Sequence, residues 1–243
     1  MTKITLGIIG GGQLGSMLAT AAKKLKIRTI IFSDDVNSPG QMFSDEFISG
    51  DYNDLSKIKE FTNKVDLITF EFENITYETL KKLNDLKKVI PKPEINKIIQ
   101  NRLSEKDFIN SLGINTTEYK FIENLEDIKR NSDLIPGILK TCTLGYDGKG
   151  QYKINNLDEI EKLKINFPQK YILEKLVNLK KEISVIITRF GNNNYEIYEP
   201  IENTHQDQIL NHSKIPAEIS EKILHQSKDW ATTIAEELKY IGT

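Results

Sequence analysis

The sequence predicts an α/β protein in which a Rossmann-like parallel sheet is followed by a second unit of mixed strands and helices. The first sign is an apolar run over residues 4–9 that ends in a glycine-rich turn, Gly10–Gly15. Apolar residues then recur at helical spacing from Met17 to Leu25, and another strand is expected over residues 28–32. Strand, turn, helix and strand in this order make a βαβ unit, whose two strands are parallel.

Residues 1–93 are predicted to form one doubly wound domain. A helix around residues 58–61, a strand over 67–72 and a helix over 77–86 continue the alternation. A short strand at Val89 and Ile90 is expected to stop at the prolines that follow. Strands that alternate with helices favour a parallel sheet covered on both faces.

The rest of the chain is predicted to form three further parts. Residues 94–118 are expected to be a connector of two helices that ends near Gly113. Residues 119–177 are expected to be a compact α+β unit, with strands at 119–122, 138–143, 151–154 and 171–173 and helices at 125–131 and 157–163. Residues 178–243 are expected to contain a hairpin of 182–188 and 195–199 and an amphipathic helix over 217–238.

The composition argues against several classes of protein. The 243 residues carry a formal charge of −2 with both signs interspersed, whereas nucleic acids and anionic membranes usually demand a concentrated basic excess. The single cysteine, Cys142, cannot form an internal disulfide, and no apolar run approaches the length of a membrane span. Because Met1–Gly10 is too short and too glycine-broken for a secretion signal, we expect a soluble cytoplasmic protein.

The most informative segment is residues 137–151. It places Lys140 on an apolar strand directly before a turn that carries a second lysine, Lys149, and three glycines, Gly145, Gly148 and Gly150. Glycines let backbone N–H groups approach anionic oxygens, and a lysine on an apolar strand needs an anionic partner. Since a strand is expected again from Gln151, the turn joins two antiparallel strands, unlike a Walker loop. The pattern predicts a polyphosphate site.

The turn at Gly10–Gly15 leaves three interpretations open. Gly10-x-Gly12-x-x-Gly15 matches the dinucleotide fingerprint and has acidic residues about 20 positions on. It also fits another phosphorylated ligand, to which Gln13 at the helix start can donate, or simple packing. On the first interpretation the protein is a nicotinamide-dependent oxidoreductase.

Several polar residues have both a functional and a plain interpretation. Glu174 ends an apolar strand, where the segment to Val177 can offer backbone hydrogen bonds to a purine and Glu182 can accept from ribose hydroxyls, but each glutamate can equally be solvated. His205 follows a strand and can be ordinary loop surface, and Arg102 is either a phosphate clamp or a helix-surface charge. Glu71 and Glu73 alternate at a strand end, so they are expected on one face with a hydrogen-bonding or cationic partner.

Taken together, five motifs resemble those of the ATP-grasp superfamily, and within it the 5-(carboxyamino)imidazole ribonucleotide synthases of purine biosynthesis. The motifs run in the family's order and are G-G-Q-L-G at 11–15, F-E-F-E-N at 70–74, N-R-L-S-E-K at 101–106, G-Y-D-G-K-G-Q at 145–151 and E-N-T-H-Q-D at 202–207. The resemblance implies a pre-ATP-grasp domain over 1–93, a lid subdomain over 119–177 and, from 178, the incomplete start of the ATP-grasp core.

The resemblance also implies a reaction and its residues. ATP would phosphorylate bicarbonate to carboxyphosphate, whose carboxyl group the amine of 5-aminoimidazole ribonucleotide captures. The residues expected to bind ATP are Arg102, Lys140, Gly145, Tyr146, Asp147, Gly148, Lys149, Gly150, Gln151, Glu174, Lys175, Leu176, Val177, Glu182 and His205. Catalytic roles fall to Tyr146, Asp147, Lys149 and His205, and the ribonucleotide would be held by Gln13, Leu14 and Glu73.

The chain departs from the family pattern in two places. Lys149 stands where the family commonly has arginine, which keeps the charge but loses a planar bidentate grip. Family members also continue beyond the position of Thr243, and that part carries the ligands of Mg²⁺. We therefore expect no metal ligands within the chain, a fragment that is inactive by itself, and a homodimer at full length. The alternatives are another ATP-grasp purine or carboxylate ligase and a non-catalytic nucleotide-binding remnant.

Overall fold

The computed structural model describes residues 4–145, 150–163, 165–167, 169–206 and 209–243. They form two compact units, one that reaches to Lys97 and one that runs from Ile98 to Ile241. No helix in the described part of the chain is long and apolar enough to cross a membrane.

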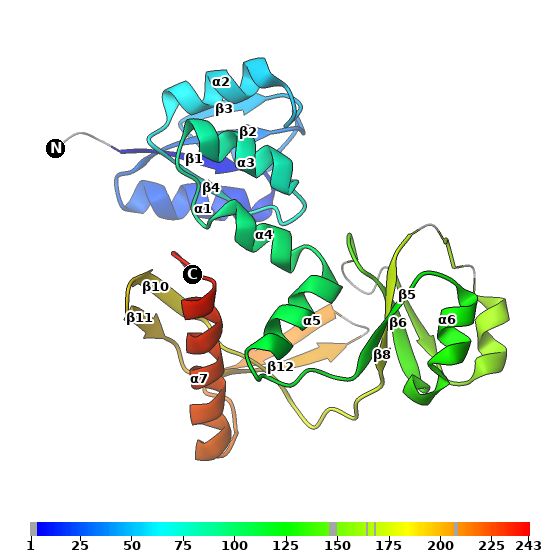
Figure 1. Cartoon of the computed structure of the whole chain (residues 1–243). Coiled ribbons are helices and arrows are strands. Elements are labelled where there is room, and N and C mark those ends of the chain that lie inside the picture. Colours follow the sequence, from blue (N-terminus) through cyan, green and yellow to red (C-terminus); the bar gives the residue numbers. More distant parts are fainter. Residues whose placement is uncertain (1–3, 146–149, 164, 168, 207–208) are drawn as a thin grey trace. The chain divides into compact units, whose positions relative to one another are not determined.

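The first unit is built on a parallel sheet. Its strands are β1 (Thr5–Ile9), β2 (Arg28–Ser33), β3 (Glu46–Ser49) and β4 (Leu67–Phe70), in the spatial order β3-β2-β1-β4. All three neighbouring pairs are parallel (Figure 1). The predicted Rossmann-like sheet is therefore confirmed.

Helices cover both faces of this sheet because side chains alternate along each strand. Ile9, Phe32 and Ile68 pack with residues of α2 and α3 in one core, whereas Ile8 and Ile31 pack with Ala19 of α1 on the other face. Asp54 and Thr76 begin α2 and α3 by accepting backbone N–H groups. The bounds are α1 (Gln13–Lys24), a 3₁₀ turn η1 (Pro39–Met42), α2 (Leu55–Lys64) and α3 (Tyr77–Leu86).

Three predictions for the first unit need correction. Strand β3 was not predicted; its four residues pair in parallel with β2. The strand expected to reach residue 72 ends at Phe70, because its partner β1 ends at Ile9, opposite Phe70. The expected strand at Val89 and Ile90 is one parallel bridge between Val89 and Ile68.

The second unit begins with helices and an antiparallel sheet. The helices are α4 (Pro93–Ile99), which spans the boundary between the units, and α5 (Arg102–Ser111). The sheet has the order β5-β8-β6-β7, formed by β5 (Tyr119–Ile122), β8 (Tyr171–Lys175), β6 (Gly137–Thr141) and β7 (Gln151–Ile154). Strands β6 and β7 pair antiparallel, as predicted for the strands that flank residues 145–151, the glycine segment.

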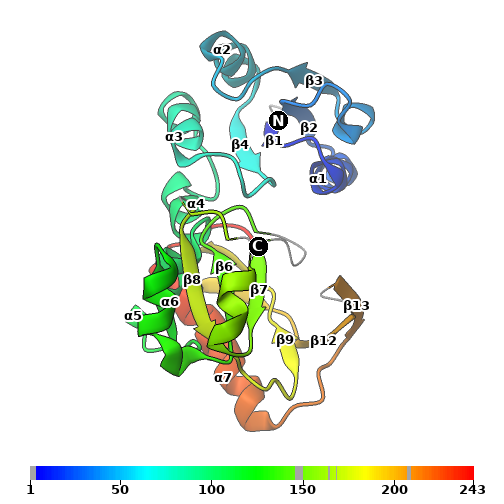
Figure 2. The same cartoon turned by 90° about the vertical axis from the view of Figure 1, so that its right-hand side faces the viewer.

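The two faces of this sheet differ in character. Figure 1 shows α5 and α6 (Leu125–Arg130) on opposite sides of it, and Figure 2 shows β8, β6 and β7 side by side. Leu139, Leu173 and Ile128 are fully buried in the core on the α6 side, to which the 3₁₀ segments η2 (Ser132–Leu134) and η3 (Leu157–Lys162) also contribute. The segment expected as a helix over 157–163 is thus a 3₁₀ segment. The side chains that alternate with this core point toward α5.

The last part of the second unit consists of two small sheets and a helix. Strand β9 (Glu182–Ser184) joins β12 (Ile201–Gln206) and β13 (Ile209–Lys214), whereas β10 (Ile187–Gly191) pairs with β11 (Asn194–Ile197). The single strand expected over 182–188 is therefore wrong, because its two ends pair in different sheets. The tight hairpin at residues 191–194 is confirmed.

Helix α7 (Glu221–Glu237) begins later than predicted. Ser220 accepts the N–H of Ile223 and so caps the helix, which leaves residues 217–220 outside it. The helix packs on β10 through Arg189, which is 4% exposed and donates from Nε and Nη2 to the two carboxylate oxygens of Glu236 at 3.0 and 2.9 Å. A planar guanidinium matches a carboxylate in this two-bond geometry.

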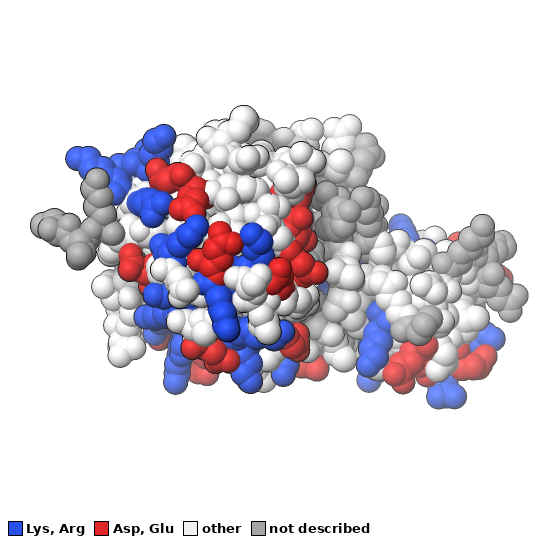
Figure 3. Space-filling view, turned by 90° about the horizontal axis from the view of Figure 1, so that it is seen from above, with Lys and Arg blue, Asp and Glu red and all other residues white. Residues whose placement is uncertain are grey.

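Charged side chains of both signs are interspersed on the face shown in Figure 3. Exposed ion pairs in the first unit include Lys57 with Glu60 at 3.1 Å and Arg28 with Glu46 at 3.0 Å. Among the described residues, this face presents no single-sign patch.

Candidate functional site

A buried carboxylate bound by two lysines lies on the α5 side of the sheet in the second unit. The side chain of Glu174 is 8% exposed; its Oε2 lies 2.7 Å from Nζ of Lys140 and its Oε1 lies 3.2 Å from Nζ of Lys106. A buried carboxylate is tolerated when it is paired in this way. Two ammonium groups and one carboxylate leave the cluster with a formal charge of +1, which favours an anionic ligand.

Strand register explains why these groups meet. Glu174 of β8 lies directly opposite Tyr119 of β5 on one side and Ile138 of β6 on the other. Lys140 is two residues beyond Ile138, so it projects from the same face as Glu174. Lys106 reaches this face from α5. The strand that carries Lys140 leads directly to the glycine segment.

Helix α5 also holds the base of that segment. The Nη1 and Nη2 atoms of Arg102 donate to the carbonyl oxygens of Thr141 and Gly145, both at 2.9 Å, and its backbone N–H donates to Cys142 O at 2.9 Å. Arg102 and Lys106 are one helical turn apart and therefore share a face of α5. The helix thus contacts the sheet through two cations, and none of its residues is fully buried.

The ends of the glycine segment are close to Thr141. Gly150 has φ +70°, and a Cβ built there would lie 2.7 Å from Thr141 Oγ1; a Cβ at Gly145 would lie 3.0 Å from the same oxygen. This hydroxyl is buried and has no hydrogen-bond partner within the described residues. Glycine is therefore required at 150 both by backbone conformation and by space.

Cys142 follows Thr141 and is 2% exposed. Burial raises the pKa of its thiol, while the positive charges of Arg102 and Lys170 act in the opposite direction. The protonated thiol is a weak nucleophile, so Cys142 is a packing residue of the strand end.

The backbone of Glu174–Val177 is partly used by the fold. The N–H groups of Lys175 and Leu176 donate to Glu118 O and Pro136 O, each at 2.9 Å. Within the described residues, the N–H of Val177 has no such acceptor, and its side chain is 52% exposed. Of the backbone donors expected for a purine, Val177 therefore remains available.

Glu182 and His205 come together on a different sheet of the second unit. Glu182 lies opposite Asn203, and His205 is two residues further along β12, so both project from one face. The His205 Nδ1 atom is 3.5 Å from Glu182 Oε1. His205 was expected in a loop; it lies on β12 because residues 201–206 form a hairpin with β13 that the sequence analysis missed.

In the first unit, the acidic side chain of Glu71 occupies the turn Gly10–Gly15. The Glu71 carboxylate accepts from the backbone N–H groups of Gly12 and Gly15, and burial raises its pKa despite those bonds. A Cβ at Gly10, where φ is +100°, would lie 2.8 Å from Glu71 Oε1. These N–H groups are the ones that a dinucleotide pyrophosphate would need, so the turn is better explained by packing around Glu71. The expected hydrogen-bonding partner of Glu71 is thereby confirmed.

The other residues expected in the first unit lie near this turn in the chain. Gln13 and Leu14 are exposed at the start of α1, and Gln13 lines a hollow of about 420 Å³ with Met17 and Phe43. Glu73 is exposed and follows β4. The expectation that Glu71 and Glu73 alternate along a strand is wrong, because β4 has already ended.

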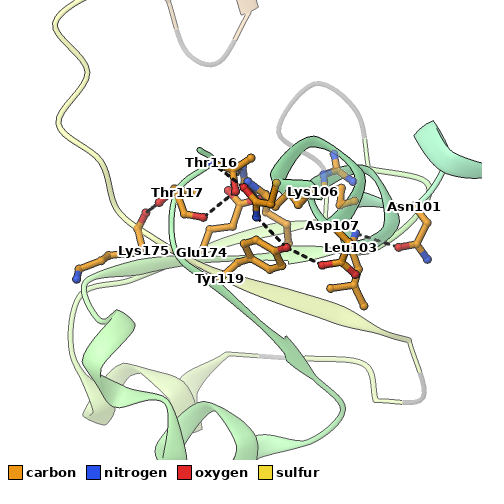
Figure 4. Close-up of polar contacts among 12 residues, drawn as sticks. Asn101, Leu103, Lys106, Asp107, Thr116, Thr117, Tyr119, Glu174 and Lys175 are labelled. Carbon is orange, nitrogen blue, oxygen red and sulfur yellow. Dashed lines mark hydrogen bonds and ion pairs between the residues drawn. The ribbon is translucent and has the colours of Figure 1, made fainter. Parts of the chain in front are cut away.

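Four expected residues, Tyr146, Asp147, Gly148 and Lys149, lie outside the described residues. Gln151 is the first residue of β7 and lies opposite Lys140. Lys106 was missed as a site residue, although its position one turn after Arg102 is a signal in the sequence. Figure 4 shows Lys106, Tyr119 and Glu174 grouped together between α5 and the sheet.

Comparison with known proteins agrees with this geometry. Residues 107–243 match the model of the ATP-grasp domain, which is more than half of the chain. The chain belongs to the ATP-grasp family. Residues 1–100 match the ribonucleotide synthetase preATP-grasp domain, so both units have a counterpart in this family.

Curated relatives of this ATP-grasp chain include N5-carboxyaminoimidazole ribonucleotide synthases. That of Staphylococcus aureus strain MRSA252 is 35% identical over 98% of this chain and 64% of its own length, and that of Bacillus subtilis strain 168 is 35% identical over 98% and 63%. The chain thus spans slightly less than two thirds of these relatives.

Solved structures of this kind superpose closely. The ADP complex of an N5-carboxyaminoimidazole ribonucleotide synthetase has a TM-score of 0.91 at 36% identity, covering 100% of this chain and 66% of that one. The Staphylococcus aureus N5-carboxyaminoimidazole synthetase complexed with ADP has a TM-score of 0.88 at 33% identity, covering 99% and 65%.

Proposed function

We propose that this chain is the ATP-binding part of an enzyme that carboxylates 5-aminoimidazole ribonucleotide with bicarbonate, through carboxyphosphate, in purine biosynthesis. The observation that carries the proposal is the group of Lys140, Glu174 and Lys106 beside the glycine segment. This group is net positive and partly buried, and it lies on the strand that leads into the glycine segment. Similar proteins have been solved in complex with ADP.

The proposed roles follow from the chemistry of the side chains. Lys140 and Arg102 would stabilise negative charge on the nucleotide, and the backbone N–H of Val177, which has no acceptor among the described residues, would donate to the base. Glu182 accepts from ribose hydroxyls, and His205 beside it donates to the nucleotide. Phosphoryl transfer requires positioning and charge stabilisation above all, and these groups supply both.

The remaining assignments are also part of the proposal. Gly145, Gly148, Gly150, Gln151, Lys175 and Leu176 would border the nucleotide. Tyr146, Asp147 and Lys149 would contact ATP and also face bicarbonate and the ribonucleotide. In the first unit, Gln13, Leu14 and Glu73 would bind the ribonucleotide. The division into 1–93, 94–118, 119–177 and 178–243, the homodimer and the cytoplasmic location remain predictions.

Magnesium, which the ATP-grasp resemblance implies, does not fit the residues at hand. Among the residues that the structure describes, no group of three His, Cys, Asp or Glu side chains could hold a metal ion. Mg²⁺ needs several oxygen ligands in a near-octahedral arrangement. No step is therefore assigned to the metal.

Nuclear magnetic resonance titration tests the proposed sites separately. ADP is expected to shift the amide signals of Lys140, Glu174 and Val177, whereas 5-aminoimidazole ribonucleotide shifts those of Leu14 and Glu73. Inosine and ribose 5-phosphate at matched concentration are the controls for non-specific shifts. If ADP leaves the second unit unchanged, the proposal fails.

The reaction is tested by the release of ADP from ATP. Stimulation by 5-aminoimidazole ribonucleotide with bicarbonate supports the proposed function, and stimulation by glycinamide ribonucleotide with formate favours another purine ligase. Because the 243-residue chain is expected to be inactive by itself, turnover is measured on a protein extended beyond Thr243 as the family members are; ADP binding without turnover for either acceptor there favours the non-catalytic alternative. Titration with NADH, which is fluorescent, is expected to show no binding, because Glu71 occupies the glycine turn.

A further inference from the structure

Glu174 is shared by two lysines that come from different elements. Lys140 extends from β6, whose end leads to the glycine segment, and Lys106 extends from α5. Each ammonium contacts a different oxygen of the carboxylate. In the proposed function only Lys140 has been given a role, so the second lysine requires an explanation.

Lys106 is anchored on the side away from the glycine segment. Its Nζ lies over the ring of Tyr119, 5.5 Å from the centroid, and the Tyr119 hydroxyl donates to Asp107 Oδ1 at 2.6 Å and accepts from Asn110 Nδ2 at 3.1 Å (Figure 4). Ring face and carboxylate together hold the ammonium in place. Because Asp107 and Asn110 belong to α5 as well, the helix fixes both Lys106 and the ring beneath it.

The side chain of Lys140 has no such anchor among its described contacts beyond Glu174 itself. If Lys140 turned to a nucleotide and Glu174 had no other cation, a carboxylate that is only 8% exposed would be left unpaired. An unpaired buried charge is strongly unfavourable. Lys140 could then leave Glu174 only at a large cost.

We propose that Lys106 is the permanent counter-ion of Glu174 and thereby frees Lys140 to bind the nucleotide. Lys106 is a positioning residue that does not touch the ligand, and the inference rests on the proposed ATP site. Its chemistry is specific: the site would need two cations for one carboxylate, so that one cation remains when the other engages the phosphates or the base.

A double-mutant cycle on the 243-residue chain tests this role, with ADP affinity measured by calorimetry. Lys106→Met retains the length of the side chain but removes its charge, so Lys140 becomes the only partner of Glu174; ADP affinity is expected to fall about tenfold. Glu174→Gln, made alone and in the Lys106→Met background, removes the charge that retains Lys140. The double variant is therefore expected to bind ADP more tightly than Lys106→Met alone.

Two further variants separate this role from simple packing. Lys106→Arg keeps a cation over Tyr119 and is expected to bind ADP nearly as well as the unaltered chain. Lys129→Met removes an exposed lysine of α6, which pairs with Glu126 at the surface, and is the matched control. Should Lys106→Met fail to fold, Lys106→Gln replaces it in the cycle with the same expected result.

The outcomes are distinguishable. Two results would overturn the role of Lys106 while the ATP site stands. One is an ADP affinity of Lys106→Met within twofold of that of the unaltered chain. The other is a double variant whose loss of ADP affinity equals the product of the losses in the two single variants. No ADP binding by the unaltered chain would overturn the site and this inference together. The role of Lys106 is supported if ADP affinity falls in Lys106→Met, recovers when Glu174→Gln is added, and is retained in Lys106→Arg.

Discussion

Arg102 joins the helical connector to the base of the glycine segment by donating from Nη2 to the carbonyl oxygen of Gly145 at 2.9 Å. Its Nη1 atom donates to the carbonyl oxygen of Thr141, the last residue of β6. The guanidinium therefore links the two residues that flank the stretch 142–144, between β6 and the glycine segment. Arg102 was expected to contact ATP directly. The structure gives it a definite second task, which is to hold the backbone that leads into the site.

Replacement of Arg102 by lysine should weaken ADP binding. A single ammonium cannot reproduce the planar two-bond geometry, so one of the two carbonyl oxygens loses its donor. We expect a loss of about tenfold, or about 1.4 kcal/mol. Isothermal titration calorimetry measures it. Arg130→Lys, at an exposed position of α6, is the control, and equal affinities for both variants would contradict the tethering role.

Alanine at Gly150 should destabilise the second unit more than alanine at Gly113 or Gly191. Gly150 combines φ +70° with a Cβ position 2.7 Å from Thr141 Oγ1, Gly113 has φ +74° and free space, and Gly191 has free space without a positive φ. We expect the free energy of unfolding to fall by about 3 kcal/mol for alanine at Gly150, by about 1 kcal/mol at Gly113 and by less than about 0.5 kcal/mol at Gly191. Urea unfolding followed by the fluorescence of Trp230 measures them. Equal costs at Gly150 and Gly113 would show that Thr141 does not crowd position 150.

Replacement of Glu71 by glutamine should change how the stability of the first unit depends on pH. Burial raises the pKa of Glu71 above the ordinary 4.5, so the folded state holds this proton more tightly than the unfolded chain. The ionised carboxylate therefore costs stability as the pH rises from 4.5 through the raised value. Relative to the unaltered chain, Glu71→Gln should gain stability as the pH rises from 4.5 through the raised pKa, as measured by urea unfolding followed by circular dichroism.

Glu60→Gln is the control with the opposite sign. Hydrogen bonds from Lys57 and Lys64 lower the pKa of Glu60, so its contribution is present above the unfolded value of 4.5 and lost as the pH falls through the lowered value. Relative to the unaltered chain, this variant should lose stability toward neutral pH. Parallel pH profiles for the two variants would contradict the assignment for Glu71.

Cys142 should react slowly with a thiol reagent. The residue is 2% exposed and burial raises the pKa of its thiol, so little thiolate is accessible near neutral pH. Because it is the single cysteine, the absorbance released from Ellman's reagent reports this site alone. We expect labelling to be about 100-fold slower than in the urea-unfolded chain, since reaction requires local opening. Similar rates in both states would show that the strand end is open.

Local pattern was sufficient for elements whose signals are short-range. The βαβ start, the two helices of the connector and the antiparallel strands around the glycine segment follow from periodicity, caps and turn residues within a few positions. The same signals indicated Lys140 and Arg102. They failed at residues 182–188, where one apolar run is divided between two sheets, and at His205, whose strand pairs with β13.

By itself, the sequence determined the family, the βαβ start, the helical connector, the strands around the glycine segment and the side chains able to bind a phosphorylated ligand. Only the tertiary structure decided which of them meet. Lys106, Lys140 and Glu174 are joined by helix docking and strand register, and Glu71 reaches a glycine turn more than fifty residues earlier in the chain. Such contacts depend on pairing between distant segments and on the burial of charge, which local periodicity does not encode.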